Sequence, residues 1–203
     1  MHACKVRIHQ LKRRKRRIAI ARRAGTSAAA YCRTASIPAI SYGWDVCGVA
    51  DTPLRDVRAL VARTASPDTY GRSVNLVFHA LAAAGMHIDP AYEAHALPII
   101  RWAMAWWERW VPPSALQRAH LAATDKLGRS DGRTWQSVAG PVAAAVASAW
   151  RLGWRFLSAK RLVDDVGTEW GLLRHSPAAV CAAVKRSVAC WRMRKICICA
   201  CQP

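Results

Sequence analysis

Acidic residues are scarce in this sequence. Its 203 residues include 12 Asp and Glu against 31 Lys and Arg, and no acidic residue lies in 1–42 or in 171–203. The formal net charge is +19, and the stretch 34–170 holds all the acidic residues. This balance excludes an ordinary neutral enzyme as the first interpretation and favours a polyanionic partner for the two ends of the chain.

Motifs of common catalytic and metal-binding sites are also missing. The sequence has no G-x-x-x-x-G-K-[ST] phosphate loop, no G-x-S-x-G elbow and no H-E-x-x-H, and its eight cysteines form no C-x-x-C pair. Cys197, Cys199 and Cys201 alternate in a way that separates their thiols on a strand or a helix, which does not suit zinc. The arginine-rich N-terminus has no apolar segment of a secretory signal, so reduced thiols are expected. We expect no metal, no cofactor and no catalytic residue.

Long hydrophobic runs are absent. The longest uncharged stretch, 134–150, is about three residues too short to span a bilayer. It is built of alanine and valine and contains Gly140-Pro141, which is unusual for a spanning helix. We therefore predict a buried helix there and no membrane span.

Hydrophobic residues nevertheless make up 53% of the chain and include ten tryptophans, which excludes disorder. Helical spacing, bounded by proline, glycine and capping residues, predicts a mostly α fold, an irregular helical bundle. Residues 161–170 instead alternate around a polar turn, which predicts one small β-hairpin near 161–172. The predicted helices are 5–24, 28–32, 38–42, 53–65 (with Thr52 as N-cap), 74–84, 90–110, 114–127 and 177–191.

One internal boundary is predicted at the polar, glycine-containing loop 127–133. It divides the chain into a basic helix with a helical, thumb-like domain, residues 1–127, and a C-terminal helical region, residues 128–203. The second part includes the hairpin and the cysteine-containing tail.

The first predicted helix carries the densest charge. Ile8, Leu11 and Ile18 form a narrow apolar stripe, and the rest of its circumference is cationic. Adjacent like charges repel one another, so such a run is tolerated only in solvent or opposite a polyanion. Nucleic acid is the commonest partner of this kind, and anionic lipid is the second. The residues predicted to contact phosphates are Lys12, Arg13, Arg14, Lys15, Arg16, Arg17, Arg22 and Arg23.

Two further clusters leave alternatives. Trp102, Trp106, Trp107 and Trp110 recur at separations of three and four, typical of a base-stacking platform or of a packed helical core, and the core is favoured. The sequence Asp164-Asp165 resembles the paired aspartates that hold two metal ions. Consecutive residues beside Gly167 lack the convergence that two metals need, so a solvated hairpin tip is favoured.

The segment Arg33–Gly48 reads R-T-x3-P-A-x2-Y-G-x2-V-x-G, after a basic helix and before the helical segment beginning Leu54-Arg55. This pattern resembles the segment that follows the palm in reverse transcriptases of LINE-type (non-LTR) retrotransposons. The sequence contains no Y-x-D-D motif, so the resemblance implies a fragment of an RNA-directed DNA polymerase without its catalytic palm. Such a fragment would hold a template–primer duplex through phosphates and would not be an enzyme on its own.

A second function belongs to another class. An arginine-rich, acid-free N-terminus with alanine and serine also resembles an organelle-targeting segment, in which case the remainder is a helical interaction protein. The first interpretation predicts RNA or DNA duplex as partner and a nuclear or cytoplasmic location, and the second predicts an organellar one. The oligomeric state is left open.

Overall fold

The structure is a computed structural model that describes residues 2–66 and 73–200, with side chains over 6–66 and 73–191. Its contacts divide the chain into two compact units. The first comprises Met1–Tyr42, Asp51–Ala91 and Arg192–Pro203, and the second comprises Gly43–Ala50 and Tyr92–Trp191. The boundary predicted at 127–128 falls inside the second unit.

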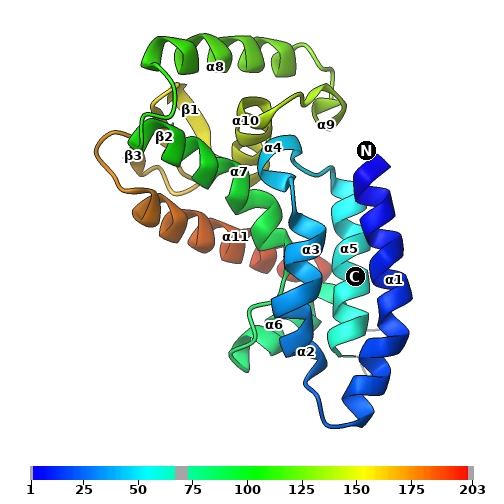
Figure 1. Ribbon diagram of the computed structural model, residues 1–203. Coiled ribbons are helices and arrows are strands. Elements are labelled where there is room, and N and C mark those ends of the chain that lie inside the picture. Colours follow the sequence, from blue (N-terminus) through cyan, green and yellow to red (C-terminus); the bar gives the residue numbers. More distant parts are fainter. Residues whose placement is uncertain (1, 67–72, 201–203) are drawn as a thin grey trace. The chain divides into compact units, whose positions relative to one another are not determined.

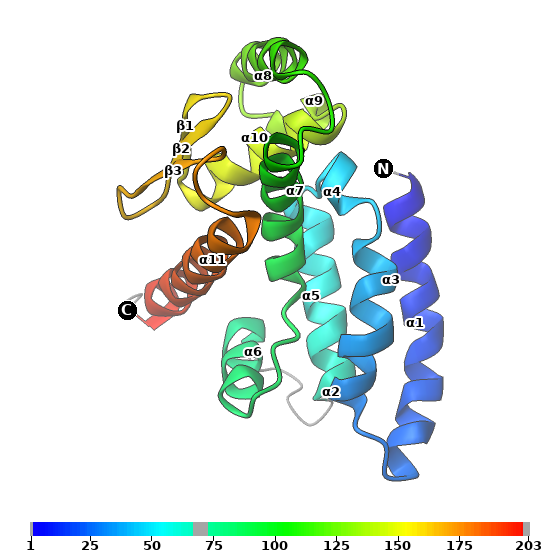
Figure 2. The same cartoon turned by 60° about the vertical axis from the view of Figure 1, so that its left-hand side comes forward.

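The first unit is built around the long basic helix α1 (His2–Arg23), which confirms the predicted helix at 5–24. Gly25 follows with a φ of 89°, a left-handed conformation that ends the helix without a Cβ penalty. Leu11 and Ile18 are buried, and α1 contacts α2, α3 and α5. Both views show α1 running alongside α3 and α5 (Figures 1 and 2).

One continuous helical segment returns along α1. It consists of α2 (Ala28–Tyr31), a π-helical turn η1 (Cys32–Ser36) and α3 (Ile37–Ser41). Of Thr26 and Ser27, either of which could cap this helix, Ser27 does so: its hydroxyl accepts from the Ala30 amide at 3.2 Å. Pro38 lacks an N–H and its ring clashes with the preceding turn of a regular helix. The wider turn, in which Ile37 N–H donates to Cys32 O, accommodates Pro38 without breaking the segment.

Helices α5 (Asp51–Ala65) and α6 (Val74–Ala83) complete the first unit. Helix α5 begins at Asp51, one residue before the predicted cap Thr52. Its inner face buries Leu54, Val57 and Val61, at separations of three and four. The sequence Ser66-Pro67-Asp68 predicts a break after this helix, and its last two residues lie outside the described residues.

The second unit has a helical core beside a small sheet. The unit contains helices α7 (Pro90–Trp107), α8 (Pro113–Gly128) and α10 (Pro141–Leu152), and the part of α11 (Pro177–Ala200) that ends at Trp191. The short helices α4 (Trp44–Cys47) and α9 (Thr134–Ser137) also belong to it. Trp106, Trp154 and Leu162 are among its fully buried side chains. The single helix predicted over 134–150 is wrong, because Gly140, at φ 89°, separates α9 from α10. The prediction that this stretch is largely buried is confirmed for α10.

The sheet is antiparallel in the order β1 (Arg155–Ser158), β2 (Arg161–Val163), β3 (Glu169–Gly171). Strands β2 and β3 are the predicted hairpin, and Leu162 pairs with Trp170. Strand β1 was not predicted. A mostly α fold with one small β element is therefore confirmed, with a third strand added. No helix in the described part of the chain is both long and apolar enough to cross a membrane.

Gly48 is a position where the fold requires glycine. Its φ is 60°, and a Cβ there would lie 2.6 Å from the Trp135 ring. That ring also stacks under the Arg151 guanidinium, 3.7 Å from the ring centroid, and Arg151 donates to Val49 O. We expect Gly48→Ala to lower the free energy of unfolding by about 2–3 kcal/mol, through strain and overpacking together.

Urea unfolding followed by tryptophan emission measures this effect, because all ten tryptophans belong to the second unit. Gly128→Ala is the matched control: Gly128 ends α8 and nothing lies within 4 Å of a Cβ added there. The control should match the parent protein or exceed it. Equal urea midpoints for Gly48→Ala and Gly128→Ala would contradict the close contact between residue 48 and the Trp135 ring.

Candidate nucleic-acid interface

The cations of the first helix lie on the surface of the first unit. Side chains from Lys12 to Arg17 are all exposed, as are Arg22 and Arg23. Helix α1 has no acidic residue, and none of the six cations at 12–17 has a hydrogen bond or ion pair among the described residues. The run is therefore unneutralised by the protein over the part of the chain that the structure describes.

These cations do not share one face. At about 100° per residue, six consecutive positions encircle a helix. Measured from the direction of the buried Leu11 and Ile18, Arg14, Lys15 and Arg22 lie within about 50° of the packed side. The others point away from it and define what we call the outer cationic face: Lys12, Arg13, Arg16, Arg17 and Arg23. Arg13 and Arg16 point furthest outward.

Arg7 shows what an arginine near the packed side does. Its guanidinium donates to Tyr42 O and lies 5.1 Å from the centroid of the Tyr42 ring. Tyr42 follows the end of α3, where a cation complements the helix dipole. Arg7 therefore links α1 to the end of α3 and does not belong to the outer cationic face.

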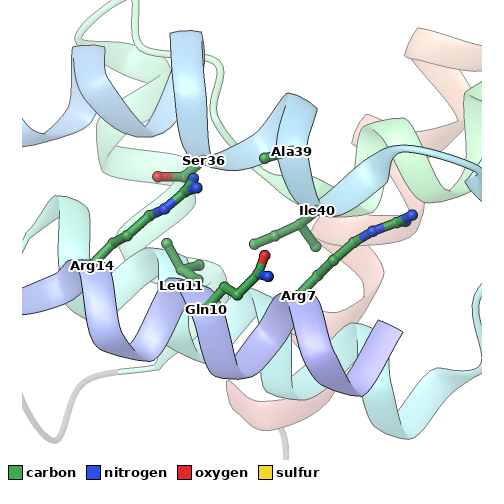
Figure 3. A pocket seen from close by; sticks show the side chains of 7 residues that line it. All are labelled: Arg7, Gln10, Leu11, Arg14, Ser36, Ala39 and Ile40. Carbon is green, nitrogen blue, oxygen red and sulfur yellow. The ribbon is translucent and has the colours of Figure 1, made fainter. Parts of the chain in front are cut away.

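A small cavity lies between α1 and the segment η1–α3 (Figure 3). Arg14 extends toward Ser36 at one end, Arg7 extends the opposite way, and Gln10 lies between them. The cavity volume is about 10 Å³, which is room for one water molecule. A nucleotide does not fit inside a space of this size, so this cavity is not the candidate binding site.

The predicted tryptophan cluster divides into two pairs. Trp102 and Trp106 are 4% and 2% exposed and contact each other edge to face, with ring centroids 5.9 Å apart. The predicted core packing is thus confirmed for this pair. Trp107 and Trp110 are exposed, and Trp110 lies beyond α7, which ends three residues earlier than predicted. The favoured core packing therefore does not extend to Trp107 and Trp110.

Asp164 is not at a solvated tip, which corrects that prediction. It is buried, and its Oδ1 accepts from the amides of Val166 at 3.1 Å and Thr168 at 2.7 Å. Its Oδ2 accepts from Trp170 Nε1 at 3.1 Å and from Arg186 at 2.9 Å. Burial raises the pKa of Asp164, but these donors outweigh burial and bring the pKa below its ordinary value.

The neighbouring carboxylate of Asp165 also accepts a hydrogen bond from the protein. It accepts from the Ser187 hydroxyl, which in turn accepts from Trp154 Nε1 at 2.9 Å. The two aspartates therefore fasten the hairpin to α11, and the four acceptor positions of Asp164 are filled by protein donors. Among the described residues no cluster of His, Cys, Asp or Glu could hold a metal ion. The side chains of the Cys197–Cys201 tail lie outside the described part.

Two side-chain pairs were not predicted from the sequence. Arg58 forms a two-point ion pair with Asp89 in the first unit, with nitrogen–oxygen distances of 2.9 and 2.8 Å. Tyr92 OH lies 3.2 Å from Cys181 Sγ in the second unit, and burial is the main cause of its raised pKa. Burial likewise raises the pKa of the Cys32 thiol to about 11, which makes that thiol a poor nucleophile.

Comparison with protein-family models, curated proteins and solved structures finds no significant match. The resemblance of 33–48 to a retrotransposon reverse transcriptase is neither supported nor opposed by these comparisons.

Proposed function

We propose that this chain is a non-catalytic nucleic-acid-binding module that contacts phosphates through the outer cationic face of α1. The observation that carries the proposal is a run of six exposed cations on an acid-free helix, without an ion pair among the described residues. Adjacent like charges repel one another, and a bound polyanion removes that repulsion. Phosphate contacts of this kind fix position and carry little sequence information.

The sequence resemblance narrows the partner within this proposal. It implies a thumb-like fragment of an RNA-directed DNA polymerase, for which the ligand is a template–primer duplex, in particular an RNA–DNA hybrid. The saturated acceptors of Asp164 support a non-catalytic role, because a carboxylate whose acceptor positions are all filled by protein donors has none free for a metal ion.

The packing of α1 bears on the alternative of a removable targeting segment. Leu11 and Ile18 are 2% and 4% exposed, so cleavage after α1 would uncover part of the core of the first unit. This arrangement favours a helix that is retained as part of the fold.

Salt dependence tests the proposal. If the five cations of the outer cationic face neutralise about five phosphates, the logarithm of the binding constant for an RNA–DNA hybrid falls with the logarithm of salt concentration at a slope of about −4.5. Filter binding or fluorescence anisotropy at several salt concentrations measures the slope. A slope near zero, or no binding at low salt, would end the proposal.

A double variant locates the contact. We expect Arg13→Gln with Arg16→Gln to make the slope shallower by about 2. If variant and parent bind equally at 1 M salt, the variant then binds about 60-fold more weakly than the parent at 0.1 M salt. The matched control, Arg118→Gln with Arg133→Gln, removes the same charge from exposed positions of the second unit. Equal losses in the two double variants would mean that net charge, and not the outer cationic face, drives binding.

A further inference from the structure

The end of α7 contains a strained residue. Trp110 N–H donates to Ala105 O at 3.3 Å and Arg109 has a φ of 54°, which is the left-handed cap that usually contains glycine. An arginine in this conformation costs roughly 1 kcal/mol relative to glycine. Strained backbone conformations of this kind cluster at functional sites.

The tryptophans on either side of Arg109 are unusually open. Trp107 is 45% exposed and Trp110 is 49% exposed. Neither ring takes part in an aromatic or cation–π contact in the part of the chain that the structure describes. By contrast, Trp102 and Trp154 are buried, and their indole N–H groups are bonded to Ala159 O and Ser187 Oγ.

The polar end of Trp110 is already satisfied. Its Nε1–H donates to the Glu108 carboxylate at 2.6 Å. This bond orients the indole and pairs its only polar hydrogen, so the ring faces are purely aromatic surface. An exposed aromatic held in this way presents a ready surface for another planar ring.

We propose that Trp107, Arg109 and Trp110 form a stacking site for the bases of single-stranded nucleic acid. Indole faces stack on any base, and a guanidinium adds a cation for the base or its phosphate. The inference rests on the proposed function. The second unit, which holds these three residues, carries 13 Lys and Arg against 8 Asp and Glu, and this net charge of +5 is the reason to favour nucleic acid over a protein as the occupant. The stacking site would contact bases, whereas the proposed function of α1 is to contact phosphates.

Two single strands of equal charge test the site. One is a 12-nucleotide mixed-sequence strand, and the other is an abasic strand with the same number of phosphates. We expect the intact protein to bind the base-containing strand at least tenfold more tightly, measured by fluorescence anisotropy in moderate salt. Equal affinity for the two strands would overturn the stacking site.

Substitutions then place the effect. Trp107→Ala with Trp110→Ala should weaken binding of the base-containing strand about 10- to 100-fold and leave abasic and duplex binding within twofold. Arg109→Gly keeps the turn, relieves its strain and should weaken binding of the same strand by about threefold. Trp150→Ala removes another exposed tryptophan and serves as the control, with no expected change.

The remaining outcomes separate this inference from the proposed function. Duplex binding with a steep salt slope, combined with indifference to bases, would overturn the stacking site alone. Absence of any nucleic-acid binding at low salt would overturn both. A change of oligomeric state in the double tryptophan variant, with unchanged strand affinity, would identify the surface as a protein interface and overturn stacking.

Discussion

Arg58→Ala is expected to lower the free energy of unfolding of the first unit by about 3–5 kcal/mol. The Arg58 and Asp89 side chains are only 10% and 5% exposed, and the guanidinium bonds both carboxylate oxygens. It also donates to Asn75 Oδ1 at 2.8 Å and lies 5.4 Å from the centroid of the Phe78 ring. Removing it leaves a buried carboxylate without its cation, which costs far more than the pair itself contributes.

Urea unfolding followed by far-ultraviolet circular dichroism measures the loss, and tryptophan emission monitors the second unit in the same samples. Arg55→Ala, one turn earlier on the exposed side of α5, is the control and should change stability by less than about 0.5 kcal/mol. Asp89→Ala combined with Arg58→Ala should cost less than the sum of the single variants, because the two side chains form one pair. Additive losses, or similar losses for Arg55→Ala and Arg58→Ala, would contradict the buried pair.

Local sequence signals predicted most helix ends correctly. Helix α6 ends at Ala83, within one residue of the predicted end, and is followed by Gly85 at φ 76°. Ser176 caps α11 by accepting from the Ala179 amide at 3.3 Å. These signals act within one or two turns, so they are visible in the sequence. The end of α7 was missed because its left-handed residue is Arg109 instead of glycine.

Contacts between distant residues could not be predicted in the same way. Arg58 and Asp89 are 31 positions apart, and Asp164 and Arg186 are 22 apart. Helical spacing from Leu54 and Val61 places Arg58 nearer the buried face than Arg55, but no local signal identifies Asp89 as its partner. The short strand β1, Arg155–Ser158, likewise becomes a strand through its pairing with β2.

The candidate interface lies between these two cases. The exposure of residues 12–17 was predictable from charge repulsion alone. Their division between the outer cationic face and the packed side depends on Leu11 and Ile18, which the apolar stripe already marked. The openness of Trp107 and Trp110 was not predictable, because all four tryptophans of this region share helical spacing and only tertiary packing distinguishes the buried pair.

Asp164→Ala is expected to cost the second unit about 3–4 kcal/mol at neutral pH. One carboxylate accepts two backbone amides, the Trp170 indole and the Arg186 guanidinium, so its loss leaves several donors without their acceptor. The turn after β2 and the attachment of α11 should loosen together. Tryptophan emission during urea unfolding reports this directly, and Asp125→Ala, at an exposed site of α8, is the control.

The pH dependence identifies the charged form of Asp164 as the stabilising one. Because its pKa in the folded protein is below the ordinary value of 3.8, the carboxylate stabilises the fold above about pH 4. That contribution is lost as the pH falls through the folded pKa. Asp164→Asn keeps one acceptor oxygen but turns an NH₂ group toward donors, so it should be less stable than the parent at pH 7, and the difference should shrink toward pH 3. A difference that stays constant between pH 7 and pH 3 would show that Asp164 stabilises the hairpin without its charge.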